Sequence, residues 1–101
     1  MKAPHTIASM NDLRAEIDLM DARIVDLLAQ RAQLIDRAAE LKPNEGLPAR
    51  IESRVEEVVA NVRGFAQARG LDADLTEDLW RRLIDWSIAR EELVLGKGDD
   101  A

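Results

Sequence analysis

The stretch LRAEIDLMDARIVDLLAQRAQLIDRAAELK, residues 13–42, decides the fold of this 101-residue chain. Its apolar residues follow one another at steps of four and three, the period of one face of an α-helix. They are Leu13, Ile17, Met20, Ile24, Leu27, Leu34, Ala38 and Leu41. Arg31 fills the one gap in this series, where a leucine would be expected. Its simplest interpretation is a long side chain that reaches solvent or pairs with a carboxylate such as Asp26 or Asp36.

Capping and proline signals bound this first helix. Ser9 precedes the apolar series, and Asp12 follows three residues on as the acidic partner of a capping box. Pro43 disfavours helical geometry in the residue before it, so the helix is expected to end near Lys42. PNEGLP, residues 43–48, is then a loop, and its glycine and two prolines leave open whether it closes over a ligand.

Two shorter helices are expected beyond this loop. One follows Pro48 and stops at Gly70. Its apolar face is formed by Ile51, Val55, Val58, Val62 and Phe65. The other begins around residues 72–76 and runs to about Leu95. Because no stretch alternates apolar and polar residues, the fold class is predicted to be all-α, with three helices in each protomer.

The composition excludes several classes of protein. Hydrophobic residues make up 47% of the chain, which indicates a globular domain, and the net charge of −6 argues against a nucleic-acid partner, since phosphate binding needs a basic face. The sequence contains no cysteine, and its one histidine, His5, lies in the irregular N-terminal stretch, so neither a thiolate nor a histidine metal site is expected. No apolar run approaches the length of a membrane span or a signal peptide, so we expect a soluble cytoplasmic protein.

The length of the first helix predicts a homodimer. One domain, residues 9–95, is expected between an N-terminal tail (residues 1–8) and a C-terminal tail (residues 96–101). Roughly 32 helical residues give a rod of about 48 Å, whereas a domain of this size has a radius of gyration of about 13 Å. A second apolar flank lies beside the first, at Val25, Leu28, Ala32 and Ile35. We therefore expect two long helices to pack together, most simply antiparallel about a two-fold axis.

Basic residues along the chain give Arg31 a second interpretation. Lys42 lies eleven residues on, nearly on the same face and about 16 Å away, which leaves room for a small anion between the two side chains. In an antiparallel dimer, Arg14 of one chain would approach Arg31 of the other and form two equivalent cationic sites. Taken alone, Lys42 is a cation that stabilises the end of a helix. Arg14 is then a solvated residue, as is Arg54 near the start of the second helix.

Polar residues also interrupt the third helix. Its stripe consists of Trp80, Ile84, Ser87, Glu91 and Val94, at steps of four and three. The hydroxyl of Ser87 can bond back to a helix carbonyl. Glu91 is harder to explain, because a buried carboxylate must be paired or protonated. The alternative is a rotation of the helix that places Glu91 at the rim of the core.

Three segments together resemble the all-α class of chorismate mutases, over roughly residues 10–95. They are residues 13–42, LPARIESRVEEV at residues 47–58 and GLDADLTEDLWRRLIDWSIAREE at residues 70–92. The most specific feature is the pattern of two arginines and a lysine on the first helix with an arginine on the second. The resemblance implies an intertwined helical homodimer that converts the small molecule chorismate to prephenate without cofactor or metal.

The resemblance also implies a role for each site residue. Arg14 reaches across from the partner chain, and Arg31 and Arg54 bind the substrate carboxylates. Lys42 contacts a carboxylate and the ether oxygen. Ser87 makes a hydroxyl contact, and Glu91 is a second donor to the ether oxygen. Lys42, Glu91 and Arg31 are thus the expected catalytic residues.

Two departures from the family pattern keep other functions open. Many members have glutamine at the position of Glu91; a glutamate donates only when protonated, so activity is expected to rise toward acid pH. Ile51 and Val55 stand where bacterial mutases commonly have acidic residues. This second departure, with LIDWSIA at residues 83–89, also resembles the isochorismate-pyruvate lyases of salicylate synthesis. A non-enzymatic dimeric interaction module is the third interpretation.

Overall fold

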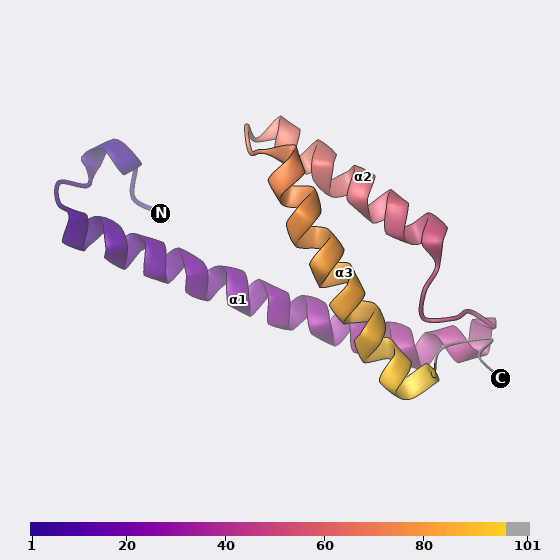
Figure 1. Ribbon diagram of the computed structural model, residues 1–101. Coiled ribbons are helices and arrows are strands. Elements are labelled where there is room, and N and C mark those ends of the chain that lie inside the picture. The colour runs from indigo at the N-terminus through magenta and orange to yellow at the C-terminus, as the bar shows by residue number, and fades with distance from the viewer. Residues whose placement is uncertain (97–101) are drawn as a thin grey trace. The chain divides into compact units, whose positions relative to one another are not determined.

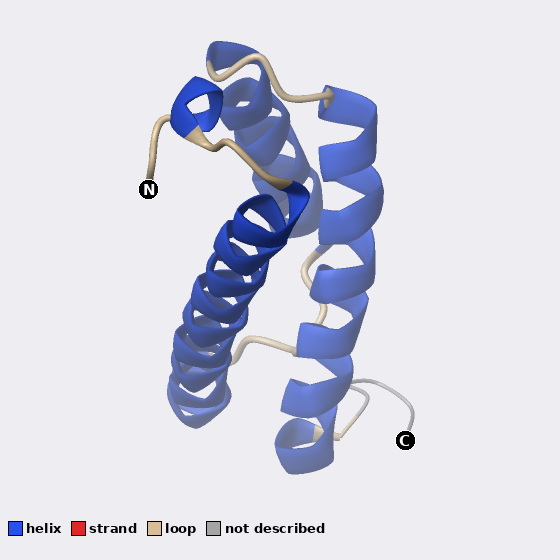
Figure 2. Ribbon diagram, turned by 90° about the vertical axis from the view of Figure 1, so that its left-hand side faces the viewer, coloured by secondary structure: helices blue, strands red, loops and turns tan. Residues whose placement is uncertain are grey.

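The computed structural model describes residues 1–96, and in this range it contains helices and no strand (Figures 1 and 2). In chain order the elements are η1 (Pro4–Thr6), α1 (Met10–Leu41), η2 (Lys42–Glu45), α2 (Glu52–Ala68) and α3 (Ala73–Leu95). The all-α prediction with one long N-terminal helix is confirmed. The expected C-terminal tail is residues 96–101, and all of it beyond residue 96 lies outside the described part of the chain.

The chain forms two compact units, Met1–Gln33 and the part from Leu34 onward. The first contains most of α1, and the second contains the last turns of α1 together with η2, α2 and α3. None of the helices in residues 1–96 is long and apolar enough to cross a membrane.

The predicted ends of α1 are confirmed. The Ser9 hydroxyl oxygen accepts a hydrogen bond from the backbone N–H of Asp12 at 3.1 Å, as an N-cap does. At the other end the α-helix gives way after Leu41 to the short helix η2, which contains Pro43. Lys42 is therefore the first residue beyond the long helix, where the chain changes direction.

The apolar series on α1 is not covered within one chain. Ile24 is 48% exposed, Leu27 62% and Leu34 72%, and Ala39 is the one buried residue of the helix. Much of this series therefore lies at the surface of a single chain, and its burial against a second copy stays a prediction. Contiguous apolar surface of this kind in a folded protein marks an interaction site.

The core of the second unit lies between α2 and α3, which run side by side as a hairpin (Figure 1). Its buried residues are Ala49, Val55, Val59, Ile84 and Ile88, with Val58, Trp80 and Leu95 packed against them. The predicted face of α2 is partly wrong. Val59 and Ala66 are buried, whereas Phe65 is 58% exposed and lies under the Arg69 guanidinium, 5.8 Å from the ring centroid.

Gly70 makes the turn between the two helices. Its φ of 69° lies in the left-handed region that favours glycine. The N–H of Leu71 donates to the carbonyl of Ala66 at 2.9 Å, and the N–H of Gly70 donates to that of Gln67 at 3.3 Å. These two bonds form a Schellman motif, which ends α2 and reverses the chain into α3.

A line of ion pairs joins the outer faces of α2 and α3. Arg81 donates to both carboxylate oxygens of Glu56, at 3.2 and 3.0 Å, and to Glu77 at 2.7 Å. Arg63 contacts Asp74 at 3.0 Å and Glu77 at 2.9 Å. Hydrogen bonds from Arg81 lower the pKa of both Glu56 and Glu77. The apolar core holds the hairpin together, and these charges lie at its surface, where such pairs add little stability.

Asp72 caps the start of α3. Its carboxylate accepts hydrogen bonds from the N–H groups of Asp74 at 2.9 Å and Leu75 at 3.2 Å. Asp72→Ala should lower the free energy of unfolding by about 1 kcal/mol. The measurement is urea denaturation followed by circular dichroism. Asp72→Asn is the matched control, because asparagine caps a helix nearly as well; a loss as large as that of Asp72→Ala would contradict the capping role.

Candidate functional site

Lys42 and Glu91 form an ion pair inside the second unit. The Lys42 ammonium nitrogen lies 2.7 Å from Oε1 of Glu91, and the two side chains are 18% and 5% exposed. Glu91 belongs to the buried face of α3, with Ile84, Ser87 and Ile88. The alternative that places Glu91 at the rim of the core is therefore wrong. The structure brings together a cation and a carboxylate that lie 49 residues apart in the sequence.

The loop after α1 places the Lys42 side chain. The backbone N–H of Leu47 donates to the Lys42 carbonyl at 2.9 Å, and Gly46 has a φ of 68°, so the chain turns tightly over η2. This turn returns Ala49 to Lys42, and the ammonium donates a hydrogen bond to the Ala49 carbonyl at 2.7 Å. Ala49 is also part of the apolar core, so the loop that positions Lys42 is attached to the α2–α3 hairpin.

The contact at Glu91 is a charge pair in which hydrogen bonding is incomplete. Oε1 of Glu91 is buried and accepts no hydrogen bond within the described part of the chain, although the ammonium of Lys42 is close to it. A buried carboxylate oxygen usually accepts at least one hydrogen bond, and the exceptions are concentrated at catalytic and ligand sites. The ammonium at 2.7 Å nevertheless compensates the negative charge of this oxygen, so the contact is a close charge pair with little access to water.

Ser87 lies one helical turn before Glu91 on the same face of α3. It is 3% exposed, and its hydroxyl donates to the Leu83 carbonyl at 2.8 Å. The predicted back-bond to the helix is therefore confirmed. The spacing of four residues places the Ser87 side chain next to that of Glu91.

Asp36 and Arg90 form a second contact between the end of α1 and α3. Arg90 donates from Nε and Nη2 to the two carboxylate oxygens of Asp36, at 2.6 and 2.9 Å. The same guanidinium lies over the Trp86 ring, 5.3 Å from its centroid. The hydrogen bonds from Arg90 hold the pKa of Asp36 below its usual value. Sequence reasoning missed Arg90, because nothing in the pattern links residues 54 positions apart.

The predicted arginines occupy different environments. Arg14 is exposed and Arg31 is half-buried, both on the part of α1 that belongs to the first unit. Arg54 is near the start of α2, its side chain is 62% exposed and it pairs with Glu57. Of the six predicted site residues, the structure thus places Lys42, Ser87 and Glu91 in one buried cluster and Arg54 at the surface of the same unit.

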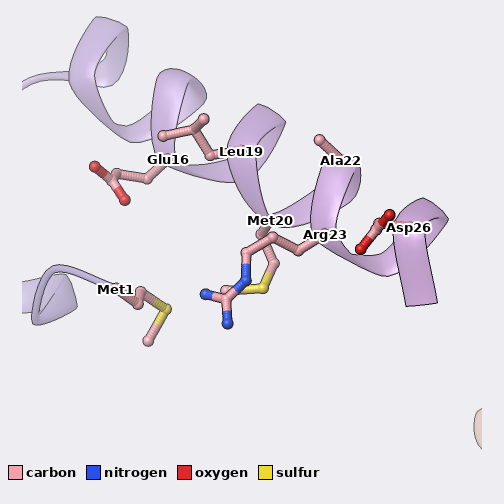
Figure 3. Close-up of a pocket in the computed structure, with 7 residues that line it drawn as sticks. All are labelled: Met1, Glu16, Leu19, Met20, Ala22, Arg23 and Asp26. Atoms are coloured by element: carbon pink, nitrogen blue, oxygen red, sulfur yellow. The ribbon is translucent and has the colours of Figure 1, made fainter.

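Two hollows in the surface do not coincide with the predicted cations. In the first unit, Figure 3 shows the side chains of Met20 and Arg23 reaching from α1 toward Met1, beside a hollow of about 460 Å³. In the second unit, residues of the 43–49 loop line a hollow of about 450 Å³ together with Leu95 and Gly96. None of the six predicted site residues lines either hollow. A single chain therefore does not enclose its predicted cations in either of these hollows.

Comparison with known proteins places this chain in a family. The model of the family described as chorismate mutase type II matches residues 13–92. A T-protein of Enterobacter agglomerans is 36% identical over 84% of this chain, and the chain spans 23% of that protein's length. An isochorismate pyruvate lyase of Pseudomonas aeruginosa is 33% identical over 90% of this chain and 89% of the lyase.

A 4-amino-4-deoxychorismate mutase of Streptomyces venezuelae is 31% identical over 84% of this chain and 82% of that protein. The last two relatives are thus matched over nearly their whole length, whereas the T-protein is matched over about a quarter of its own. The family model covers both Lys42 and Glu91. The chain belongs to the chorismate mutase type II family.

Proposed function

We propose that the protein is a chorismate mutase that rearranges chorismate to prephenate. It acts as a homodimer on this small molecule, in the cytoplasm, without cofactor or metal. The observation that supports this most directly is the buried Lys42–Glu91 pair, whose carboxylate oxygen Oε1 accepts no hydrogen bond within residues 1–96. The Lys42 ammonium, held largely out of water, is suited to an ether oxygen that becomes negative during the reaction.

The chemistry suits these side chains. The rearrangement is pericyclic, so it needs neither a nucleophile nor a base. The protein has to hold the dianion in its compact conformer and place positive charge at the breaking C–O bond. In this proposal Lys42 is the point charge at the ether oxygen and Glu91, when protonated, is the second donor.

The remaining roles concern binding. Arg31, Arg54 and the partner chain's Arg14 hold the substrate carboxylates, since guanidinium groups match them with two parallel hydrogen bonds. Arg54 would exchange its exposed contact with Glu57 for a substrate carboxylate. Ser87 contributes a contact at the substrate hydroxyl.

The uncovered face of α1 supports the homodimer. Leu27 and Leu34 are more than half exposed in one chain, and Val25, on the flank beside them, is 64% exposed. A second copy packed antiparallel along α1 would cover these residues by two-fold symmetry and give an intertwined bundle. It would also bring the partner's Arg14 toward Arg31.

One comparison favours a second function, isochorismate-pyruvate lyase. The lyase of Pseudomonas aeruginosa matches this chain over nearly the full length of both proteins. In addition, Val55 is 7% exposed and packs in the α2–α3 core, an apolar environment unlike that of the acidic residue that bacterial mutases commonly carry. A non-enzymatic module is less consistent with the site, because such a module has no need of a buried Lys42–Glu91 pair.

Replacing Arg31 tests the function directly. Purified protein should consume chorismate, seen as a loss of ultraviolet absorbance, and Arg31→Ala should lower kcat/KM by about 100-fold or more, because a charged donor to the dianion is lost. Arg37→Ala is the matched control, since it removes an exposed guanidinium from the same helix. Salicylate fluorescence from isochorismate, with chorismate left intact, would instead identify the lyase.

Mixing two inactive variants tests the shared site. Arg14→Ala and Arg31→Ala homodimers should each be inactive. A mixed dimer has one site with both arginines intact, so equal mixing after unfolding and refolding should restore about a quarter of the wild-type turnover. If no activity returns while the proteins refold as dimers, Arg14 does not act across the interface.

The pH dependence of turnover tests the role of Glu91. Because the carboxyl group donates only when protonated, kcat should rise toward acid pH. Glu91→Gln supplies a donor at every pH and should flatten this profile. Circular dichroism at each pH controls for unfolding. A Glu91→Gln profile as steep as that of the wild type would remove Glu91 from the reaction.

A further inference from the structure

Two ion pairs link the end of α1 and the start of η2 to α3 in the second unit, and they differ in burial. The Lys42–Glu91 pair is almost fully buried, whereas the Asp36 and Arg90 side chains are 46% and 40% exposed. Arg90 and Glu91 are neighbours in the sequence. Asp36 precedes Lys42 by six residues, which corresponds to about 9 Å along a helix. The exposed pair thus involves the last turns of α1, six residues before Lys42 in the chain, and lies one residue before the buried pair on α3.

The exposed pair has a restricted geometry. Arg90 uses two nitrogens against the two oxygens of Asp36, at 2.6 and 2.9 Å. The Trp86 ring, one turn earlier on α3, lies against the guanidinium at 5.3 Å. Two parallel hydrogen bonds and a stacked ring keep the Arg90 guanidinium from sliding along the Asp36 carboxylate or rotating about it. A single contact from a lysine would allow both movements. This pair therefore restrains the last turns of α1, from Leu34 onward, both along α3 and in their distance from it.

Stability alone is a poor explanation for such a pair. Ion pairs with this degree of exposure contribute little to folding, because water and salt screen them. Catalysis, in contrast, is sensitive to small displacements of the charged groups: about 1 Å of misplacement can lower a rate by up to about 100-fold. A contact that adds little stability can therefore still have a large effect on turnover.

We propose that Asp36 and Arg90 are positioning residues, which hold α1 against α3 so that the Lys42 ammonium meets the Glu91 carboxylate. Neither side chain touches the substrate. Trp86 supports the pair by limiting the orientations open to Arg90. The inference rests on the proposed function in one respect, namely that Lys42 and Glu91 act on the reacting ether.

The first measurement is turnover of chorismate. Arg90→Gln should lower kcat about tenfold and leave KM within about twofold, because the arginines that bind the carboxylates are unchanged. Arg90→Lys, which keeps the charge without the fork, should be intermediate. Arg81→Gln is the matched control. Arg81 is 42% exposed and binds Glu56 with two nitrogens, yet it contacts neither Lys42 nor Glu91. It should leave kcat unchanged, and wild-type kcat in Arg90→Gln would overturn the proposal.

The second measurement needs no substrate. Lys42→Met, Glu91→Gln and the double variant give the coupling between Lys42 and Glu91 from urea unfolding. These substitutions preserve side-chain volume, so the variants should fold. In the Arg90→Gln background the coupling should fall to less than about half, whereas in the Arg81→Gln background it should be unchanged. Undiminished coupling in the Arg90→Gln background would overturn the positioning role.

The two measurements separate the two proposals. A wild-type protein that turns over neither chorismate nor isochorismate would overturn the proposed function. The coupling would still decide whether Asp36 and Arg90 position Lys42 against Glu91, because unfolding is measured on the ligand-free chain.

Discussion

The ion pair between the buried Glu91 carboxylate and the Lys42 ammonium is the interaction on which the rest of the proposed site depends. Removing both charges from solvent costs several kcal/mol for each ion, and only close and well-placed partners offset that cost. The chain supplies this closeness at 2.7 Å by ending α1 at Leu41, turning η2 back through Gly46 and presenting Glu91 on the buried face of α3. Each of these elements has other roles in the fold, but together they determine where the pair lies.

The two units differ in how complete they are as folded structures. The second has an apolar core, a Schellman turn and a line of ion pairs between α2 and α3. The first consists mainly of helix whose apolar residues, including Ile17 and Ile24, remain about half exposed. Tertiary packing, rather than helix propensity, stabilises most helices in proteins. The exposed apolar residues of α1 therefore need an apolar surface outside their own chain to cover them. In the proposed homodimer, α1 of the second copy provides that surface.

Local signals made the helix boundaries predictable from the sequence. Ser9, Pro43 and Gly70 act through their own backbone or through neighbours three or four residues away, so their effect can be inferred without the fold. The steps of four and three likewise placed Glu91 on the same face of α3 as Ile84 and Ser87, although they left open whether this residue lies in the core or at its rim. In each case the cause lies within a few residues of the effect.

Side-chain pairing and helix rotation were not predictable in the same way. On α2 the periodicity fits two adjacent faces, and packing against α3 selected the one with Val59 and Ala66 and left Phe65 outside. The contact of Asp36 with Arg90 depends on where two helices meet, which no local pattern encodes. The positions of Arg14 and Arg31 relative to the buried pair depend on how chains assemble, and they remain predictions.

The hydrogen bond from Lys42 to the Ala49 carbonyl has a consequence for selectivity. In the ligand-free chain the ammonium is already solvated by protein: a backbone dipole on one side and a carboxylate on the other. An incoming molecule has to offer an acceptor strong enough to join or displace these groups. In the proposed site, a compound of the substrate's shape without such an oxygen would offer the Lys42 ammonium no acceptor in exchange and would bind less well.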